Sequence, residues 1–290
     1  MGKCNACPRN CNVDRSTQLG YCKERSLRVA RVSLHFWEEP PISGERGSGT
    51  VFFSGCNLKC VYCQNYDISQ GKGKEISPSA LADIFKRIED AGAHNINLVT
   101  PSHFVDEIVK AREIYSPSIP IVYNCGGYES LESLEKLKGI VDIFLPDFKY
   151  SDDTLAKRYS NCNDYFRVCS QAILKMRQLC PVDKFKDGLM QKGLIIRHLV
   201  LPKSIPNTKG VLDWIAGNLS LDTYVSLMSQ YVPCGRAKDF TELSDKILPL
   251  EYKIATSYAE KLGLSNTFVQ DFSSASEDFI PDFDTSPIEF

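Results

Sequence analysis

Short apolar runs alternate with helix-like patterns along the chain from Thr50 onward. The runs predict strands at residues 50–54, 96–100, 119–124, 141–145, 194–201 and 224–228. Between and after them, apolar residues at helical spacing predict helices at residues 77–92, 104–115, 131–137, 166–179, 210–219 and 251–262. The first of these, SPSALADIFKRIEDAG, begins with Ser and Pro and ends with Gly, as helices commonly do. This alternation indicates an α/β fold around a parallel sheet.

Six such units can form an open sheet or a partial barrel, and periodicity alone does not decide between the two. In both arrangements the active site lies at the carboxyl ends of the strands. Polar residues do follow the predicted strands: a cysteine loop after the first, Thr100 after the second, Asn124 after the third, and Asp147 with Lys149 after the fourth. We therefore expect these residues to gather at one end of the sheet.

The composition excludes several classes of function. With 43% hydrophobic and 24% charged residues and no long uninterrupted apolar stretch, the 290-residue chain gives no indication of a membrane protein. The formal net charge of -2 does not favour nucleic acid or anionic lipid as a partner. The first residues, MGKCNACPRNCNVDR, lack the apolar stretch of a signal peptide, so we expect a cytoplasmic protein.

Three cysteines lie on one loop directly after the first predicted strand. In GCNLKCVYCQN, Cys56, Cys60 and Cys63 have the spacing C-x3-C-x2-C. A cubane [4Fe-4S] cluster takes four ligands, so three local thiolates leave one iron open to a substrate or cofactor. The alternatives are a zinc site completed by a distant ligand and reduced buried cysteines.

A second set of cysteines lies at the N-terminus. Cys4, Cys7, Cys11 and Cys22 have the spacing C-x2-C-x3-C-x10-C, which suits a structural zinc site or a second iron-sulfur cluster. Unliganded thiols or a disulfide remain as alternatives. The other five cysteines are expected to be ordinary buried residues. They are Cys125, Cys162, Cys169, Cys180 and Cys234.

The cysteine loop, with Tyr62 as its aromatic residue, resembles the radical S-adenosylmethionine (SAM) superfamily. The segments EEPPISGERGSGTVFFSGCNLKCVYCQN, NINLVTPSHF, YNCGGYE, VDIFLPDFKY, RHLVLP and LMSQYVP resemble an incompletely characterised branch similar to pyruvate formate-lyase activating enzyme. The resemblance implies a partial (β/α)6 TIM-like barrel with an N-terminal Cys-rich extension. It also implies that SAM chelates the open iron and is split reductively to a 5'-deoxyadenosyl radical. We expect an N-terminal metal-binding extension (1–49), a barrel (50–264) and an acidic tail (265–290).

The resemblance also suggests residues that contact SAM. Tyr62 is expected against the adenine, and Thr100 stands where many relatives have a GGE-type segment. Asn124 begins NCGGYE, whose glycines suit either a close approach to the ribose or a tight turn. Asp147 and Lys149 are expected to reach the carboxylate or ammonium of SAM, the alternative being a surface ion pair.

Charged and polar residues on the last two predicted strands complete this set. Strand alternation directs one of Arg197 and His198 inward. An inward cation needs an anion, and Arg197 is the first choice, while His198 suits a core histidine equally well. Gln230 occupies the place of ribose-contacting groups in the relatives.

Three functions are compatible with these residues. The first is hydrogen abstraction from a protein or peptide, including installation of a glycyl radical on a partner enzyme. The second is radical chemistry on a small molecule or ribosomal peptide with an auxiliary cluster. The third is a non-catalytic iron-sulfur or zinc protein. Both radical functions require a one-electron donor such as flavodoxin or ferredoxin.

The last twenty residues contain six acids and no Lys or Arg, which is typical of a solvated tail, with a docking segment as the alternative.

Overall fold

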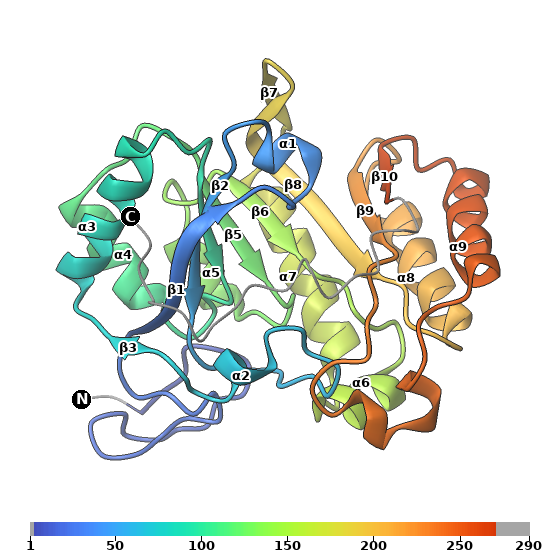
Figure 1. Cartoon of the computed structure of the whole chain (residues 1–290), viewed down its shortest axis with the longest axis horizontal. Helices are drawn as coiled ribbons and strands as arrows, with labels where there is room; N and C mark the ends of the chain where they lie inside the picture. The colour runs from blue at the N-terminus through green and yellow to red at the C-terminus, as the bar shows by residue number, and fades with distance from the viewer. Residues whose placement is uncertain (1–2, 271–290) are drawn as a thin grey trace.

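A twisted, mostly parallel sheet forms the centre of the protein, and helices cover its outer face (Figure 1). The structure is a computed structural model that describes residues 3–270. The strands are β1 Arg28–His35, β2 Ser48–Phe53, β3 Lys74–Glu75, β4 Ile96–Val99, β5 Ile121–Cys125, β6 Ile143–Pro146, β7 Lys184–Lys186, β8 Leu189–Leu199, β9 Tyr224–Met228 and β10 Thr267–Val269. The helices are α1 Pro40–Ser43, α2 Tyr66–Ser69, α3 Pro78–Asp90, α4 Val105–Ile114, α5 Leu131–Lys136, α6 Asp153–Ser160, α7 Tyr165–Leu179, α8 Ile205–Asn218 and α9 Pro249–Leu262, with 3-10 turns at Ala237–Asp239 and Thr241–Leu243.

The strand order is β10-β9-β8-β6-β5-β4-β2-β1-β3, and β7 pairs with β8. All six predicted strands are present, as β2, β4, β5, β6, β8 and β9, and they pair in parallel in the order of the sequence. All six predicted helices are present as well, as α3, α4, α5, α7, α8 and α9. The sheet is not closed into a ring, which confirms the partial barrel.

Helix α3 shows how the sequence determines these elements. The Ser77 side chain accepts a hydrogen bond from the Ala80 amide at 3.1 Å, and Pro78 occupies the first turn. Apolar residues on one face of the helix are buried, Leu81 and Phe85 completely. Each such side chain stabilises the fold by roughly 1.5–3 kcal/mol. The helix ends before Gly92, whose φ of 80° suits glycine.

A segment that precedes the barrel strands was not predicted. We call residues 28–43 the β1–α1 segment. Strand β1 pairs with β2 antiparallel, and the chain then crosses to α1, which packs against β8 (Figure 1). A Cβ on Gly44, just after α1, would lie 2.7 Å from the Leu189 side chain of β8. The segment therefore spans from one side of the barrel sheet to the other.

The expected domain boundaries at residues 49 and 264 cut through this sheet. Strand β1 lies before the first boundary and is hydrogen-bonded to β2, so only residues before Arg28 lie outside the sheet on that side. Strand β10 lies beyond the second boundary and pairs in parallel with β9. Strand β1 has eight residues and lies between β2 and β3, whereas β10 has three residues and lies at the edge of the sheet. The final twenty residues of the predicted acidic tail lie outside the described residues, so its character stays a prediction. Among residues 3–270 we find no helix with the length and apolarity needed to span a bilayer.

Candidate functional site

The loop after β2 carries Cys56, Cys60 and Cys63 and begins at Gly55. The glycine has a φ of 77°, and a Cβ there would lie 2.5 Å from the Cys22 carbonyl oxygen. No other residue fits this position without moving the backbone. The cysteine loop is therefore packed directly against the N-terminal segment.

In this loop Cys60 is buried and Cys56 and Cys63 are half-buried, and the three thiols are close enough that Cys60 affects the pKa of the other two. The Cys60 sulfur lies 3.0 Å from the Ser160 hydroxyl, which can donate to it, and the Leu58 amide donates to the Cys56 sulfur at 3.3 Å. Burial, together with the neighbouring thiols, raises the pKa of Cys56 and Cys63. Such thiols stay protonated until a metal ion supplies the positive charge that stabilises the thiolate. A soft, three-sulfur donor set on one loop fits a cluster that leaves one iron unligated by protein.

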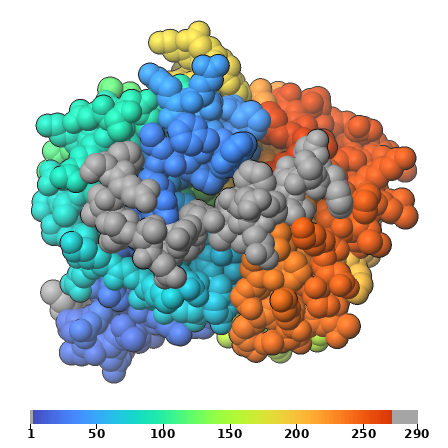
Figure 2. Space-filling model, in the orientation of Figure 1, coloured from blue at the N-terminus to red at the C-terminus, as the bar shows by residue number. Residues whose placement is uncertain are grey.

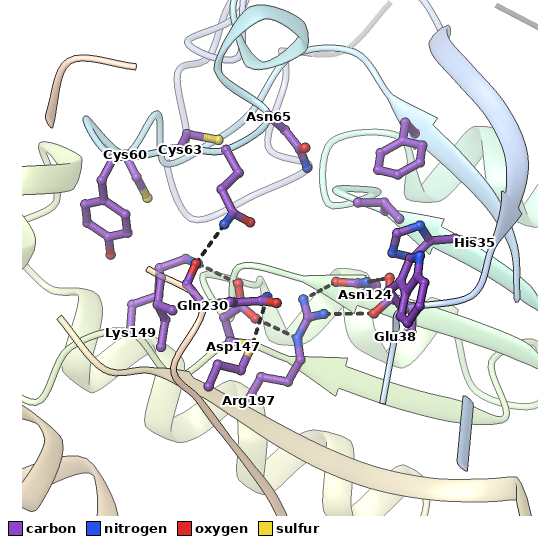
Figure 3. A pocket seen from close by; sticks show the side chains of 17 residues that line it. His35, Glu38, Cys60, Cys63, Asn65, Asn124, Asp147, Lys149, Arg197 and Gln230 are labelled. Atoms are coloured by element: carbon purple, nitrogen blue, oxygen red, sulfur yellow. Dashed lines mark hydrogen bonds and ion pairs between the residues drawn. The ribbon is translucent and has the colours of Figure 1, made fainter. Parts of the chain in front are cut away.

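An ion-pair network lies opposite this loop, centred on Arg197 of β8. The guanidinium donates to Asp147 Oδ1 at 2.8 Å, to Glu38 Oε2 at 3.1 Å and to Asn124 Oδ1 at 2.5 Å (Figure 3). Its side chain is only 14% exposed, so it depends on these partners. The expectation that Arg197 points inward is confirmed, and Asn124, Asp147 and Arg197 are brought together as predicted.

Asp147 joins this network to the cysteine loop. Its second carboxylate oxygen accepts from Lys149 Nζ at 2.5 Å. Burial alone would raise the pKa of Asp147, but the Arg197 and Lys149 charges hold it below its usual value. Both side chains of the pair are about one-sixth exposed, at 17% each, which contradicts the alternative of a simple surface ion pair. Lys149 is also close enough to the cysteine loop that Cys60 raises its pKa, after Asp147.

Glu38 was missed by the sequence analysis. It lies between β1 and α1 and accepts hydrogen bonds from Asn97 at 3.1 Å and Asn124 at 3.3 Å as well as from Arg197. Burial raises its pKa. The available signal was that an arginine within an apolar strand needs acids. However, Asp147 already provided an acidic partner for Arg197 in that prediction. Nothing in the sequence linked Arg197 to a residue 159 positions earlier.

A cavity of about 200 Å³ lies between the cysteine loop and the ion-pair network (Figure 3). Gln64 of the loop donates to the Gln230 carbonyl at 3.1 Å and so connects the two sides. Most of the predicted site residues line the cavity. They are Cys60, Tyr62, Cys63, Asn124, Asp147, Lys149, Arg197 and Gln230, and unpredicted residues such as His35, Trp37, Glu38 and Asn65 join them.

Three predicted positions do not line this cavity. His198 follows Arg197 and faces outward, where it is fully buried and bonded to the Phe148 carbonyl at 2.6 Å and the Thr208 hydroxyl at 3.0 Å. It is a satisfied core histidine, and the expectation that it contacts a cofactor is not met. Thr100, which has a φ of 60°, and Cys56 are also outside the lining.

The ring of Tyr62 was expected against the adenine of SAM, and the glycines after β5 were expected to allow either a close approach to the ribose or a tight turn. The Tyr62 hydroxyl lies 2.7 Å from that of Tyr150, and its ring packs edge-on against Tyr150 and Tyr159. The ring borders the cavity but is held within an aromatic cluster. A Cβ on Gly127, at a φ of 78°, would lie 2.4 Å from the Asp147 carbonyl oxygen. This glycine therefore permits tight packing between two strand ends.

The N-terminal cysteines lie together in the segment that packs on the loop. A Cβ on Gly20 would lie 3.2 Å from the Cys22 sulfur and 3.7 Å from the Cys11 sulfur, so these two sulfurs point to one place. Arg15 donates to the Cys22 sulfur at 3.4 Å. Burial raises the pKa of Cys7 to about 12 and also that of Cys22, whereas backbone amides outweigh burial and lower the pKa of Cys11.

All twelve cysteines lie within residues 3–270 and all are free thiols, which contradicts the disulfide alternative. Within the same range, no three His, Cys, Asp or Glu side chains are close enough to hold a single metal ion. The ligands of a cubane cluster bind different irons and so stand further apart than the ligands of one ion. By residue type the four N-terminal thiols suit a zinc ion or a cluster, but within residues 3–270 they are not placed as the ligands of a single ion.

Comparison with protein families agrees with this arrangement. A family model described as the Radical SAM superfamily matches residues 50–190, which include the cysteine loop, Asp147 and Lys149. The uncharacterized protein MJ0674 of Methanocaldococcus jannaschii is 33% identical over 272 residues, covering 90% of this chain and 75% of that protein. Neither comparison identifies a substrate.

Comparison with solved structures supports the fold. Methylornithine synthase (PylB) has a TM-score of 0.50 at 17% identity, and the match covers 73% of this chain and 60% of that one. Streptococcus suis SuiB bound to its precursor peptide SuiA has a TM-score of 0.50 at 12% identity, with 76% and 48% covered. The chain thus spans about half to three-fifths of these proteins. At such identities the likeness concerns the fold alone.

Proposed function

Because this chain belongs to the radical SAM superfamily, we propose that it cleaves S-adenosylmethionine reductively and abstracts a hydrogen atom from a substrate. The observation that carries the proposal is the shared cavity, in which Cys60 and Cys63 face the Asp147–Lys149–Arg197 network. A [4Fe-4S] cluster held by Cys56, Cys60 and Cys63, with SAM on its open iron, would supply a 5'-deoxyadenosyl radical when reduced.

The residues of the chain would position the cofactor and the substrate. Lys149 offers an ammonium group to a carboxylate, and Asp147 offers a carboxylate to an ammonium group, so the pair suits the amino-acid end of SAM. Arg197 keeps Asp147 ionised and in place. The aromatic cluster of Tyr62, Tyr150 and Tyr159 packs behind the loop and limits access of water. Catalysis would then rest on positioning rather than on proton transfer.

Formation of 5'-deoxyadenosine, the product of SAM cleavage, would test this proposal. The reconstituted protein, reduced with dithionite, should form 5'-deoxyadenosine from SAM, and Cys60→Ala should lower the rate by at least about 100-fold because the cluster loses a ligand. Cys180→Ala is the matched control, since that buried thiol lies beside the Asp142 carbonyl, at the opposite ends of the strands. Equal rates in Cys60→Ala and the wild-type protein would refute the proposal.

The finer proposal is that the substrate is a protein or peptide, including a partner enzyme that receives a glycyl radical. The support is the sequence resemblance to activating enzymes. A partner incubated with the reduced protein and SAM should give a doublet signal in electron paramagnetic resonance. Failure of every candidate partner to gain such a signal would refute glycyl-radical installation.

A second candidate is radical chemistry on a small molecule or ribosomal peptide with an auxiliary cluster. It is favoured by the four N-terminal thiols, which pack directly on the cysteine loop through Gly55 and Cys22. The number of irons bound at each cysteine set separates the two candidates. A non-catalytic metal protein would form no 5'-deoxyadenosine at all.

We also propose a docking face for the one-electron donor. Arg9 and Lys59 both lie over the ring of Tyr21, at 4.1 Å and 4.7 Å from its centre, and Lys23 lies beside them. Lys59 is close enough to both cysteine sets that a thiol from each affects its pKa, and Lys23 is exposed. These cations would attract an acidic donor such as flavodoxin or ferredoxin.

A further inference from the structure

A second cavity, of about 540 Å³, lies between the β1–α1 segment and strands β9 and β10 at one end of the sheet. The two parts of the chain that form it come together in the upper half of the view in Figure 2. Phe36, Trp37 and Phe268 provide aromatic walls, and Glu39 and Ser226 provide polar groups. The aromatic side chains at its mouth are partly in solvent, with Phe36 47% exposed. The cavity is therefore open to molecules from outside.

This cavity adjoins the first one. Trp37 and Glu38 border both cavities, so the two are separated only by a short stretch of the β1–α1 segment. Ser226 pairs with Arg197 in neighbouring strands and, in a parallel register, faces the same side of the sheet. A molecule held in the second cavity would thus lie next to the proposed SAM site.

Two polar atoms in this cavity are buried without a hydrogen bond of ordinary geometry. They are Glu39 Oε2 and Ser226 Oγ, on residues that are 6% and 1% exposed. Buried oxygen atoms of this kind are costly unless a donor reaches them. Burial raises the pKa of the Glu39 carboxyl, and the Ser226 hydroxyl is near enough to act in the lowering direction, so the two groups lie next to each other. A ligand with several N–H donors could therefore reach both oxygens.

The charges around the two cavities do not balance. The lining includes three acids, of which Glu39 is buried and Glu38 and Asp147 are mostly buried, and two cations, Arg197 and Lys149. Asp147 pairs with both cations and Glu38 pairs with Arg197, and among residues 3–270 Glu39 has no ion-pair partner. Among these lining residues the acids thus outnumber the cations by one, and Glu39 is the acid without a paired cation.

The pKa of Glu39 agrees with this excess of acids over cations. Burial raises its pKa to about 7, although the Arg197 charge acts in the opposite direction. Such a shift is typical of a buried carboxyl without a cation in direct ion-pair contact. Aromatic walls add to the attraction, since the faces of Trp and Phe rings attract cations.

We propose that this second cavity binds a positively charged nitrogen group of the substrate, an alkylammonium or alkylguanidinium group, with Glu39 as its counter-ion and Ser226 as a second acceptor. The identification of the bound molecule as the substrate rests on the proposed function. The cation site itself rests on the cavity and its unpaired carboxylate.

Equilibrium dialysis of the reconstituted full-length protein at pH 8 tests the site with n-butylammonium, n-butylguanidinium and neutral 1-pentanol. At least one cation should bind at least about tenfold more tightly than pentanol, and Glu39→Gln should weaken it by at least about tenfold. Ser226→Ala should weaken it by roughly two- to fivefold. Glu45→Gln, an exposed acid just after α1, should bind as the wild-type protein does.

Equal cation binding by Glu39→Gln and the wild-type protein would overturn the proposal, as would equal binding of pentanol. If Glu39→Gln does not fold, Ser226→Ala and the pentanol comparison decide. Displacement of n-butylammonium by saturating SAM would assign Glu39 to the cofactor and would also overturn the proposal. Formation of 5'-deoxyadenosine is measured separately, without amine. Its absence would refute the proposed function alone, and absent cation binding with intact SAM cleavage would refute the cation site alone.

Discussion

The two cysteine sets differ in what lies in front of their sulfurs. Cys60 and Cys63 face a cavity that ends in an ion-pair network, so a metal centre there has space for a ligand from solution. Among the N-terminal sulfurs, those of Cys11 and Cys22 point toward each other beside Gly20, and Arg15 donates to the Cys22 sulfur. Cys4 borders a separate cavity of about 270 Å³, whose lining includes none of the residues of the Arg197 network. The two sets therefore differ in the groups that face their sulfurs.

The largest expected effect is on metal content, and it tests whether the two sets are independent. Cys60→Ala should lose about four irons per chain and keep the N-terminal metal. Cys7→Ala should keep the loop iron and lose either about one zinc or about four irons. Plasma mass spectrometry of both purified variants measures this, with Cys180→Ala as the control. Loss of the same metal from both variants would mean that the sets form a single site.

The next effect concerns the charges near each set. Arg197→Met leaves Glu38 and Asp147 without their buried cation and should lower the free energy of unfolding by about 3–5 kcal/mol. Arg15→Met removes the cation near the N-terminal set, where the guanidinium donates to the Cys22 sulfur and the His103 carbonyl, and should lower the free energy of unfolding by about 1–2 kcal/mol. Urea denaturation of the metal-free proteins compares the two. A loss below about 1 kcal/mol for Arg197→Met would contradict the importance of the network.

The smallest effect concerns the junction between the two regions. Arg9 donates to three backbone carbonyls of the barrel, those of Asn57 at 2.7 Å, Asn161 at 2.6 Å and Ser160 at 3.1 Å. Arg9→Ala should therefore lower the free energy of unfolding by about 1–3 kcal/mol. The exposed Arg25→Ala is the control and should change it by less than about 0.5 kcal/mol. Equal stability of the two variants would show that the N-terminal segment folds without this junction.

The sequence predicted the features that depend on local pattern. The barrel strands are buried on both faces and so read as apolar runs, and the loop cysteines lie within eight residues of each other. Arg197 could be predicted to face inward because a single cation in an apolar strand needs an anion. Asp147 and Asn124 followed, because parallel strands end at one edge of the sheet.

The features that the sequence did not reveal depend on contacts between distant segments. Glu38 lies 159 positions before Arg197, and no periodicity relates the two. His198 was ambiguous because its acceptors, the Phe148 carbonyl and the Thr208 hydroxyl, come from other elements. Thr100 and Gly127 follow strands as expected. Both have a positive φ, which is set by packing against other segments and not by the local pattern.

The β1–α1 segment limits how this protein can be shortened. A fragment starting at Thr50 would match the family model, yet it would lack β1 and Glu38. The backbone edge of β2 would then be unpaired, which favours association between copies of the fragment. The guanidinium of Arg197 would also lose a carboxylate that the fragment cannot replace. The smallest fragment that keeps β1 and Glu38 therefore begins before Arg28. A start between Cys22 and Arg28 would remove the N-terminal cysteines and keep the residues that line the first cavity.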